Sequence, residues 1–425
     1  FSNTRSTCKM DEKVRRRRGA GGDSSATVDD LKEEKRDAEL VAKTSQGWSA
    51  FFIALAVAGV LLACILALLP SPIEPVAYSL PSPPAWTGPL EPNDKLTQAE
   101  RVFENQLKGP ESIVRDGDYI YTGTADGRII SIYKGKISPL ARLGGKGKHC
   151  GSFDAEPTCG RPLGMRLDHE GYLLVADAYL GIFRVNVATG DVHNVLSSQT
   201  PMAGQLPKFF NDVEEGPDGT IYFTDSSTRW DRRHNRYCIL EADMSGRLLS
   251  YNPNTMHIKE LAGGFAFANG LAISSDKSHI LVAETTKARI MRYHLTGPQK
   301  GETDVFADNL PGWPDNIRKS GRGTYWVGMA SIRRGDAFSL LDFAAPYPLL
   351  RSLITKLVSQ ETMMSLIPKY GLLVELNKDG QIVRTLHDPT GKQVPAVSEA
   401  EEKDGVLYLG SYYLPYLSRV YLNKK

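Results

Sequence analysis

The sequence predicts an all-β protein, a six-bladed β-propeller with one N-terminal transmembrane helix and a helical insertion near residues 336–369. Three observations favour this fold class: a turn signal recurs six times, consecutive turns lie roughly 45 to 60 residues apart, and helical periodicity is scarce. Each turn opens a short apolar strand. The six strands begin at Tyr119, Tyr172, Thr220, His279, Thr324 and Val406.

The interval between turns is the length of a four-stranded propeller blade. Additional turns such as Ala125-Asp126-Gly127 and Asp379-Gly380 divide the units into hairpins. One interval, from Gly321 to Asp404, is too long, and it returns to the common period if residues 336–369 are an insertion. Six units of this kind predict a closed ring with a central channel.

The elements before the propeller are predicted from composition. Residues 1–47 are charged and poor in apolar residues, which predicts a disordered cytosolic tail. Residues 48–69 form an uncharged apolar run long enough to span a bilayer as a helix. Residues 70–92 are rich in proline and predict a semi-rigid spacer, and residues 93–425 hold the propeller.

The apolar run has two interpretations. A cleaved signal peptide is the alternative, but the long charged segment before it and its length favour a transmembrane signal anchor. Lys and Arg crowd its N-terminal side, whereas the Pro-rich segment has none, which predicts a cytosolic N-terminus. We therefore expect a single-pass type II protein of the endoplasmic reticulum or plasma membrane, with the propeller lumenal or extracellular.

Four oxygen-bearing side chains recur at one phase of the repeat, about five to seven residues before a turn. They are Glu111, Asn211, Asn269 and Asp315, with Asn316 next in sequence. The first strand of each propeller blade lines the channel, so these residues are expected to meet on its axis. An all-oxygen set with two carboxylates suits calcium, whereas zinc would recruit His or Cys. The alternative is that each residue only caps local backbone groups near its turn.

Several short motifs resemble a known family. Phe210-Asn211-Asp212-Val213, Asn269-Gly270-Leu271 and Pro314-Asp315-Asn316-Ile317 are similar to the strictosidine synthase, gluconolactonase and paraoxonase superfamily of six-bladed propellers. Cys159-Gly160-Arg161-Pro162 and the segment from Asp404 to Ser411 resemble the strictosidine synthase-like family more narrowly. The resemblance covers about residues 90–425.

The resemblance implies a disulfide, a metal and weak hydrolysis. A pair matching Cys150 and Cys159 is bridged in the family, whereas Cys238 is expected to be a free thiol. Calcium held partly by Asn211 and Asn269 would assist hydrolysis of an aryl ester or lactone.

The general base of the relatives is missing from this sequence. The position that matches the paraoxonase His is Leu163, and Ser398 stands where strictosidine synthases carry a glutamate. Glu399, one residue away, is the substitute candidate. Strictosidine synthesis itself is therefore not expected.

The insertion carries apolar residues at roughly helical spacing between Ser352 and Ile367. It is expected to cover the channel mouth as a lid, to lie on a membrane, or simply to pack on the propeller. A lid with its Met363-Met364 pair would imply a small apolar ester as substrate.

Two classes of function remain open from the sequence. One is a weak calcium-dependent arylesterase or lactonase, and the other is a non-catalytic receptor or adaptor with structural calcium and a protein partner on its loop face. The formal net charge of +2 is not the large positive charge typical of nucleic-acid-binding proteins, so nucleic acid is not expected as a partner.

Overall fold

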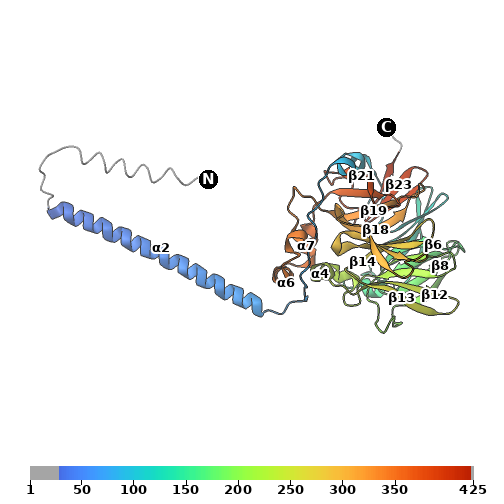
Figure 1. The fold of residues 1–425 in the computed structure, drawn as a ribbon, viewed down its shortest axis with the longest axis horizontal. Coiled ribbons are helices and arrows are strands. Elements are labelled where there is room, and N and C mark those ends of the chain that lie inside the picture. Colours follow the sequence, from blue (N-terminus) through green and yellow to red (C-terminus); the bar gives the residue numbers. More distant parts are fainter. Residues whose placement is uncertain (1–27, 423–425) are drawn as a thin grey trace. The chain divides into compact units, whose positions relative to one another are not determined.

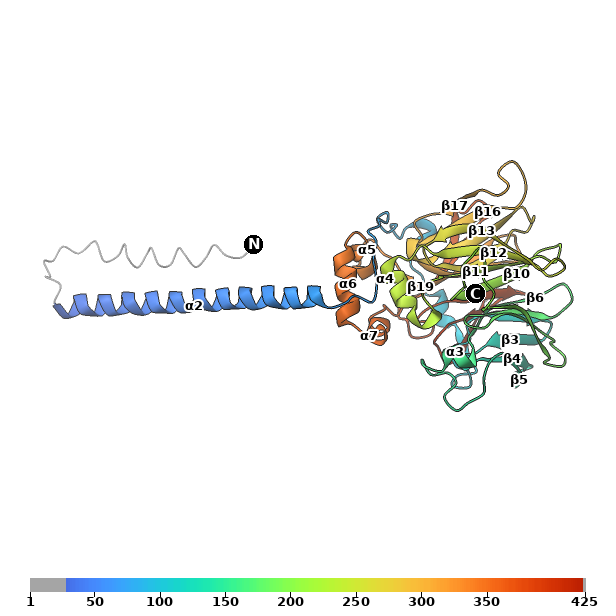
Figure 2. The same cartoon turned by 90° about the horizontal axis from the view of Figure 1, so that it is seen from below.

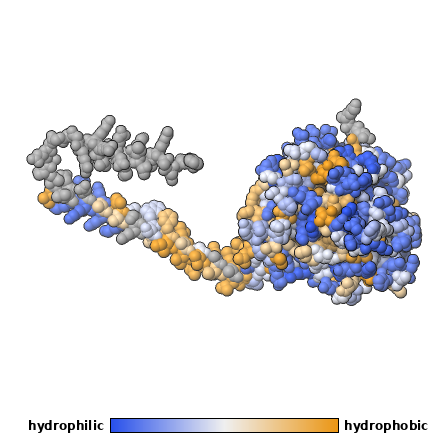
Figure 3. Space-filling view, in the orientation of Figure 1, coloured by the Kyte–Doolittle hydropathy of each residue, from blue (hydrophilic) through white to orange (hydrophobic). Residues whose placement is uncertain are grey.

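The computed structural model describes residues 28–422 and divides the chain into two compact units, with the boundary between Leu69 and Pro70. The first unit contains helix α2 (Val28–Leu68). Within the described residues it is the one helix long and apolar enough to cross a membrane, over Lys35–Leu66. Figure 3 shows its surface changing from polar to apolar along its length.

The predicted disordered tail is partly wrong. Its residues 1–27 lie outside the described part of the chain, but α2 begins at Val28 and includes the rest. The segment from Val28 to Gln46 contains no Gly or Pro and is rich in Ala, Glu, Lys and Arg, which are strong helix formers. Helix propensity therefore extends the apolar span backwards into the charged segment.

The second unit is the predicted six-bladed propeller (Figures 1 and 2). Each blade is a four-stranded antiparallel sheet. The first two blades contain β2 (Ile113–Asp116), β3 (Tyr119–Gly123), β4 (Arg128–Tyr133) and β5 (Lys136–Arg142), then β6 (Pro162–Leu167), β7 (Leu173–Asp177), β8 (Gly181–Val185) and β9 (Val192–Ser197). The next two contain β10 (Phe210–Glu215), β11 (Ile221–Asp225), β12 (Gly246–Asn252) and β13 (His257–Phe265), then β14 (Ala268–Ile273), β15 (His279–Glu284), β16 (Arg289–His294) and β17 (Thr303–Ala307). The last two contain β18 (Gly312–Lys319), β19 (Tyr325–Ile332), β20 (Gly371–Leu376) and β21 (Ile382–Asp388), then β22 (Glu399–Lys403), β23 (Val406–Gly410), β24 (Leu417–Tyr421) and β1 (Glu100–Val102).

The ring is closed by strands from the two ends of the propeller sequence. The outer strand of the sixth blade is β1, which pairs antiparallel with β24 and aligns Glu100 with Arg419. The same two side chains form an ion pair of 2.6 Å. Closure in this way holds the first and last parts of the propeller sequence together in one sheet through backbone hydrogen bonds.

The innermost strands β2, β6, β10, β14, β18 and β22 contact one another around the channel. Four of them, β6, β10, β14 and β18, carry a β-bulge at the same place. The bulges leave two consecutive residues out of the ladder in each strand: Leu163-Gly164, Asn211-Asp212, Asn269-Gly270 and Asp315-Asn316. A bulge re-aims side chains that a regular strand would point to opposite faces.

The predicted spacer over residues 70–92 is wrong, because this segment packs on the propeller. Ile73 is fully buried, and Val76 N donates to Glu241 O at 3.3 Å. Trp86 Nε1 donates to Arg333 O at 3.1 Å, and the short helices η2 (Gly88–Leu90) and η3 (Lys95–Gln98) contact β21. A proline-rich segment supplies few backbone donors of its own, and here its carbonyls accept from propeller side chains such as Arg333.

The predicted helical insertion is confirmed between β19 and β20. It consists of α5 (Leu340–Ala344), α6 (Pro348–Leu357) and α7 (Gln360–Ser365), which we call the cap. Ser339 and Ser359 cap α5 and α7 by accepting from Asp342 N and Thr362 N. Figure 2 shows the cap at one end of the propeller beside α4 (Asn235–Glu241), which follows η4 (Arg232–His234). Helix η5 (Thr285–Lys287) follows β15.

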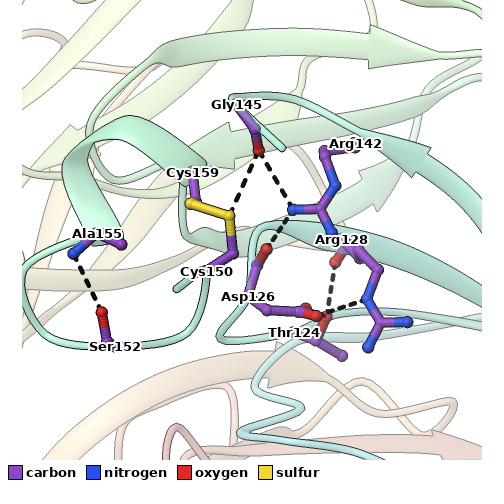
Figure 4. The surroundings of a disulfide bond; sticks show 9 residues. All are labelled: Thr124, Asp126, Arg128, Arg142, Gly145, Cys150, Ser152, Ala155 and Cys159. Carbon is purple, nitrogen blue, oxygen red and sulfur yellow. Dashed lines mark hydrogen bonds and ion pairs between the residues drawn. A yellow bond between two sulfur atoms is a disulfide. The ribbon is translucent and has the colours of Figure 1, made fainter. Parts of the chain in front are cut away.

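The predicted disulfide between Cys150 and Cys159 is present, and Cys238 is a buried free thiol. Cys159 ends the short helix α3 (Glu156–Cys159), and its backbone lies against the turn at Gly127, where an added Cβ would be 2.0 Å from Cys159 O. Arg142 Nη1 donates to Asp126 O at 2.5 Å beside the bridge (Figure 4). The disulfide loop is thus fastened to the first blade.

Candidate metal centre

The four side chains predicted to meet on the channel axis line one cavity of about 60 Å³. Glu111 lies two residues before β2, and Asn211, Asn269 and Asp315 occupy the bulges of β10, β14 and β18. Their exposed fractions are 3–5%. Residues separated by up to about 200 positions in sequence therefore share one wall because each blade repeats the same bulged strand.

The orientation of the two carboxamides is fixed by hydroxyl groups. Asn211 Nδ2 donates to Ser226 Oγ at 3.0 Å, and Ser226 Oγ donates to Ala268 O of the next blade at 2.6 Å. Because that hydroxyl proton is already used, Ser226 can only accept from Asn211, which sets nitrogen toward Ser226 and Oδ1 away from it. Asn211 Oδ1 is buried and has no hydrogen-bond partner.

The same arrangement repeats in the next blade. Asn269 Nδ2 donates to Thr285 Oγ1 at 3.0 Å, and Thr285 Oγ1 donates to Pro314 O at 2.7 Å. Asn269 Oδ1 is likewise buried without a partner. Buried acceptors are normally satisfied, so two unsatisfied oxygens lining one cavity point to a ligand.

The two carboxyl groups are electrostatically strained. Burial raises the pKa of Glu111, although the guanidinium groups of Arg161 and Arg232 act against this shift. Burial and then the charge of Glu111 raise the pKa of Asp315 well above its usual range, although hydrogen bonds from Ser398 and Asn269 oppose the change. Two acids in one buried site disfavour each other's ionised form.

One of the two carboxylates has a positively charged neighbour. Arg161 Nη2 lies 3.5 Å from Glu111 Oε2, and Arg161 is fully buried. Glu111 Oε2 nevertheless has no hydrogen bond. The second guanidinium near Glu111, that of Arg232, is paired with Glu156 at 2.6 Å, and among the described residues Asp315 has no ion-pair partner, so a cation would balance its charge.

These residues fit a hard divalent cation such as calcium. Three unsatisfied oxygens, Glu111 Oε2, Asn211 Oδ1 and Asn269 Oδ1, belong to one cavity, and calcium binds carboxylate and carboxamide oxygens. Within residues 28–422 no three His, Cys, Asp or Glu side chains are grouped so as to hold a metal. The set depends on its two carboxamides and therefore differs from a cluster of acids or histidines.

Asn316 and Glu399 lie outside the cavity lining. Asn316 packs over Gly270, where an added Cβ would lie 2.7 Å from its Oδ1. Glu399 pairs with Arg318, and its Oε1 accepts from Ile113 N at 2.8 Å. Asn316 Oδ1 is buried without a hydrogen-bond partner, so its role as a ligand stays a prediction, whereas both carboxylate oxygens of Glu399 already have partners.

Glu399 belongs to a separate ion-pair layer across the channel. Arg318 joins Glu399 to Asp212, whose Oδ2 is 2.7 Å from Arg318 Nη1. Asp212 Oδ2 also accepts from Leu271 N at 2.8 Å. Burial acts to raise the pKa of Asp212, but the positive charges of Arg318 and Arg166 outweigh it and lower the pKa. The bulge places Asn211 in the cavity and its neighbour Asp212 in this layer.

Sequence reasoning missed part of the cavity wall. Arg232 from η4, Asn235, Arg236 and Ile239 from α4, and Tyr412 after β23 all line it. Arg236 Nη2 donates to Tyr412 Oη at 2.7 Å, and Arg236 Nε donates to Met364 Sδ of α7 at 3.0 Å. These residues lie in the connections between blade strands, outside the repeat, so no periodic pattern in the sequence identified them.

The rest of the wall is apolar. Leu163, Phe209 and Phe267 line the cavity, and they belong to a buried cluster against which Leu341 of α5 packs. No histidine is among the residues that line this cavity. The cap therefore contacts the cavity wall through Leu341 of α5 and Met364 of α7.

Family models match two segments of the chain. Residues 211–298 match strictosidine synthase, and residues 88–132 match the N-terminal region of strictosidine synthase-like proteins. A solved gluconolactonase from Xanthomonas campestris is similar in fold, with 16% identity, a TM-score of 0.51, and coverage of 83% of this chain and 98% of that one.

Curated relatives align over most of the sequence. Adipocyte plasma membrane-associated protein from Salmo salar is 49% identical over 358 residues, covering 84% of this chain and 86% of its own length. The protein of that name from Homo sapiens is 48% identical, covering 84% and 85%. Strictosidine synthase-like protein 10 from Arabidopsis thaliana is 36% identical, covering 79% and 90%. The chain belongs to the strictosidine synthase-like family, together with the adipocyte plasma membrane-associated proteins.

Proposed function

We propose that this protein is a membrane-anchored, calcium-binding propeller with slow esterase or lactonase activity on small apolar substrates. The observation that carries the proposal is the group of three buried, unsatisfied oxygens from Glu111, Asn211 and Asn269 in one cavity. Asp315 completes the set with a second carboxylate.

The proposal assigns one group of cavity residues to the metal and another to the substrate. Glu111, Asn211, Asn269 and Asp315 would hold calcium through oxygen, and Ser226 and Thr285 keep the two carboxamides turned toward it. Calcium bound there would polarise a carbonyl oxygen and stabilise developing negative charge. Leu163, Phe209 and Phe267 would receive the apolar part of the substrate and exclude water around it.

Slow turnover follows from the missing base. Among residues 28–422, the carboxyl groups that line the cavity are those of Glu111 and Asp315, and both belong to the proposed ligand set. Glu399 is occupied by Arg318 and Ile113 N, so we do not assign it the role of base. An attacking water would then lose its proton to solvent. The reaction would lack the 10²- to 10⁴-fold rate enhancement that a general base typically contributes.

The cavity size restricts the substrate. About 60 Å³ is far below the roughly 300 to 1,000 Å³ of ligand pockets. Met364 of α7 is held against Arg236 and Tyr412 at the wall. We infer that α7 must move for an ester to enter.

The absence of a base and the small cavity favour one alternative. In a receptor or adaptor, calcium would act only as a structural link between blades and a protein would bind the loop face. The two functions differ in whether any ester is hydrolysed.

The proposed orientation is type II, with a cytosolic N-terminus. Lys and Arg before residue 48 and a disulfide in the propeller support it, because disulfides persist in the secretory pathway and outside the cell. The name of the relatives favours the plasma membrane over the endoplasmic reticulum for this chain too.

The test combines metal analysis with an ester screen on the purified full chain. We expect calcium near one equivalent, and phenyl acetate hydrolysis that chelation abolishes and calcium restores. Asn211→Ala and Asn269→Ala should lose both, whereas the exposed Asn254→Ala should keep both. Bound calcium without hydrolysis would select the receptor alternative, and absence of metal would reject the site.

A further inference from the structure

Helix α6 is folded with its polar side inward. Arg351 is 1% exposed and Thr355 is buried, whereas Leu349 is 87% exposed and Leu357 is exposed as well. An amphipathic helix of a soluble domain normally turns its apolar stripe to the core. The reversed arrangement leaves leucines in solvent unless something else covers them.

The inward position of Arg351 explains why the helix cannot roll over. Arg351 Nη1 donates to Leu240 O at 2.7 Å, and Nη2 donates to Ala345 O at 3.2 Å and to Val76 O. These carbonyls belong to the ends of α4 and α5 and to the segment after Pro70. Rotating α6 to bury its leucines would leave a guanidinium and three carbonyl groups unsatisfied.

Exposed aromatic residues extend the apolar surface. Phe338 is 75% exposed, and its ring lies 5.6 Å from Phe343, which lies 5.7 Å from Tyr347. We call the exposed apolar residues of this region the cap face: Phe338, Leu340, Phe343, Tyr347, Leu349, Leu357 and Leu366. Exposed apolar groups of this kind on one short segment mark an interaction surface.

The covalent chain specifies what lies near the cap face. The apolar helix α2 ends at Leu68, and Ile73 is already buried in the propeller unit. Val76 and Tyr78 bond to Glu241 O and Ala345 O, beside the cap. The five residue-to-residue steps from Leu68 to Ile73 span at most about 18 Å when the chain is fully extended. A bilayer spanned by α2 therefore lies within that reach of Ile73, in the segment whose Val76 and Tyr78 bond beside the cap.

We propose that the cap face docks into the interfacial layer of the same bilayer that α2 spans. The partner is a lipid surface, in which aromatic and leucine side chains at the headgroup level are stable. Since Met364 of α7 touches Arg236 and Tyr412 of the cavity wall, docking also turns the covered side of the cavity toward lipid. The inference rests on the proposed membrane anchor and does not depend on the proposed chemistry.

The charges beside the cap face indicate which lipids are needed. Asp336 and Glu361 are exposed there together with Lys369, so the surface has no single sign. Binding should depend on apolar burial and should occur on zwitterionic phosphatidylcholine with little dependence on salt.

The experiment places a spin label on the cap face of the full chain in phosphatidylcholine nanodiscs. Cys8 and Cys64 are changed to Ser, Cys238 stays buried, and Leu349→Cys or Phe343→Cys is labelled. The matched control is Met256→Cys, which is 76% exposed in the β12–β13 turn. Ile221 pairs with Glu215 and Tyr251, so this turn lies at the end of the blade away from Asn211.

We expect severalfold greater collision with oxygen than with a polar nickel complex at Leu349 and Phe343, and the reverse at Met256. Leu357→Glu should reduce the ratio at Leu349, whereas Val383→Glu, an exposed residue of β21, should not. Equal collision with the polar nickel complex at all labelled positions would overturn docking. Labels on the cap face that are shielded from both reagents would also overturn it, and would indicate a protein partner. Extraction of the chain by alkaline carbonate would instead reject the anchor itself.

Discussion

Asn211 and Ser226 form a directed pair in which the carboxamide nitrogen donates to the hydroxyl at 3.0 Å and the hydroxyl donates onward to the next blade. The pair thus sets which end of Asn211 faces the cavity. Thr285 does the same for Asn269. The orientation of the proposed metal ligands is therefore a property of neighbouring blades acting together.

Ser226→Ala should weaken calcium binding without removing a ligand. Without the hydroxyl, the Asn211 carboxamide is free to rotate and present nitrogen to the cavity, and loss of such a partner typically costs 10- to 100-fold in metal affinity. Calcium titration followed by calorimetry would measure it. Thr122→Ala removes a buried hydroxyl that donates to Gly123 O, and it should leave affinity unchanged. Equal affinities for both variants would contradict the orienting role.

Asp315→Asn should change stability and calcium response in opposite directions. The pKa of Asp315 is raised by burial and by Glu111, so its contribution to stability is present below the ordinary value of 3.8 and is lost as pH rises through the folded pKa. The metal-free protein should therefore weaken with rising pH, by up to about 1.4 kcal/mol per pH unit for one group. Asp315→Asn should remove that slope and stabilise the metal-free protein at neutral pH.

Wild-type protein should regain about 2.7 kcal/mol at a calcium concentration of 100 times the dissociation constant, whereas the variant should not. Thermal unfolding across pH, with calcium or chelator, measures both effects. Asp388→Asn is the control with the opposite sign. Burial acts to raise the pKa of Asp388, but hydrogen bonds from Thr390, Val394 and Gln393 outweigh it and lower the pKa. That variant should lose stability at neutral pH and approach wild type in acid.

Removal of the disulfide should destabilise the propeller moderately. Cys150 and Cys159 are separated by 9 positions, and closing a loop of this length stabilises by about 3 kcal/mol through the unfolded chain. We expect Cys150→Ser with Cys159→Ser to lower the urea midpoint, while Cys64→Ser leaves it unchanged. An unchanged midpoint for the double variant would show that the first blade holds this loop without the bridge.

Met364→Ala should admit larger substrates if the protein hydrolyses esters. Met364 Sδ accepts from Arg236 Nε and Tyr412 Oη, so truncation loosens α7 over the cavity. The ratio of kcat/KM for a naphthyl ester over phenyl acetate should rise up to about tenfold, which is 1.4 kcal/mol. Calcium affinity should not change. Met363→Ala serves as the neighbouring control, and equal ratios in both variants would argue against α7 as the barrier.

The orientation in the membrane predicts a simple protection pattern. If the positive charges hold the N-terminus in the cytosol as proposed, protease added to sealed vesicles should remove residues before Trp48 and leave the propeller intact. Immunoblots with one antibody to the N-terminal tail and one to the propeller would show which part is digested. A digested propeller with a protected tail would reverse the proposed topology.

The sequence alone determined the ring and its phase. Turn signals such as Asp218-Gly219 recur because the chain of every blade must reverse direction at the same points. Residues that favour turns can be recognised from local sequence, without knowledge of their tertiary contacts. Asn211 and Asn269 share a phase for the same reason, and the structure places both in one cavity. The apolar run of α2 and the helical insertion were also evident from periodicity and composition.

Only the tertiary structure decided what the neighbouring residues do. The bulge in β10 places Asn211 in the cavity and Asp212 against Arg318, which is 106 positions away in sequence. Strand periodicity does not predict a contact between residues so far apart. The Pro-rich segment became part of the propeller because Arg333 and Arg351 bond to its carbonyls. Helix α6 buries Arg351 for the same reason, against its own apolar pattern. Local sequence encodes where strands and turns form, whereas long-range hydrogen bonds to buried polar groups determine which face each segment turns inward.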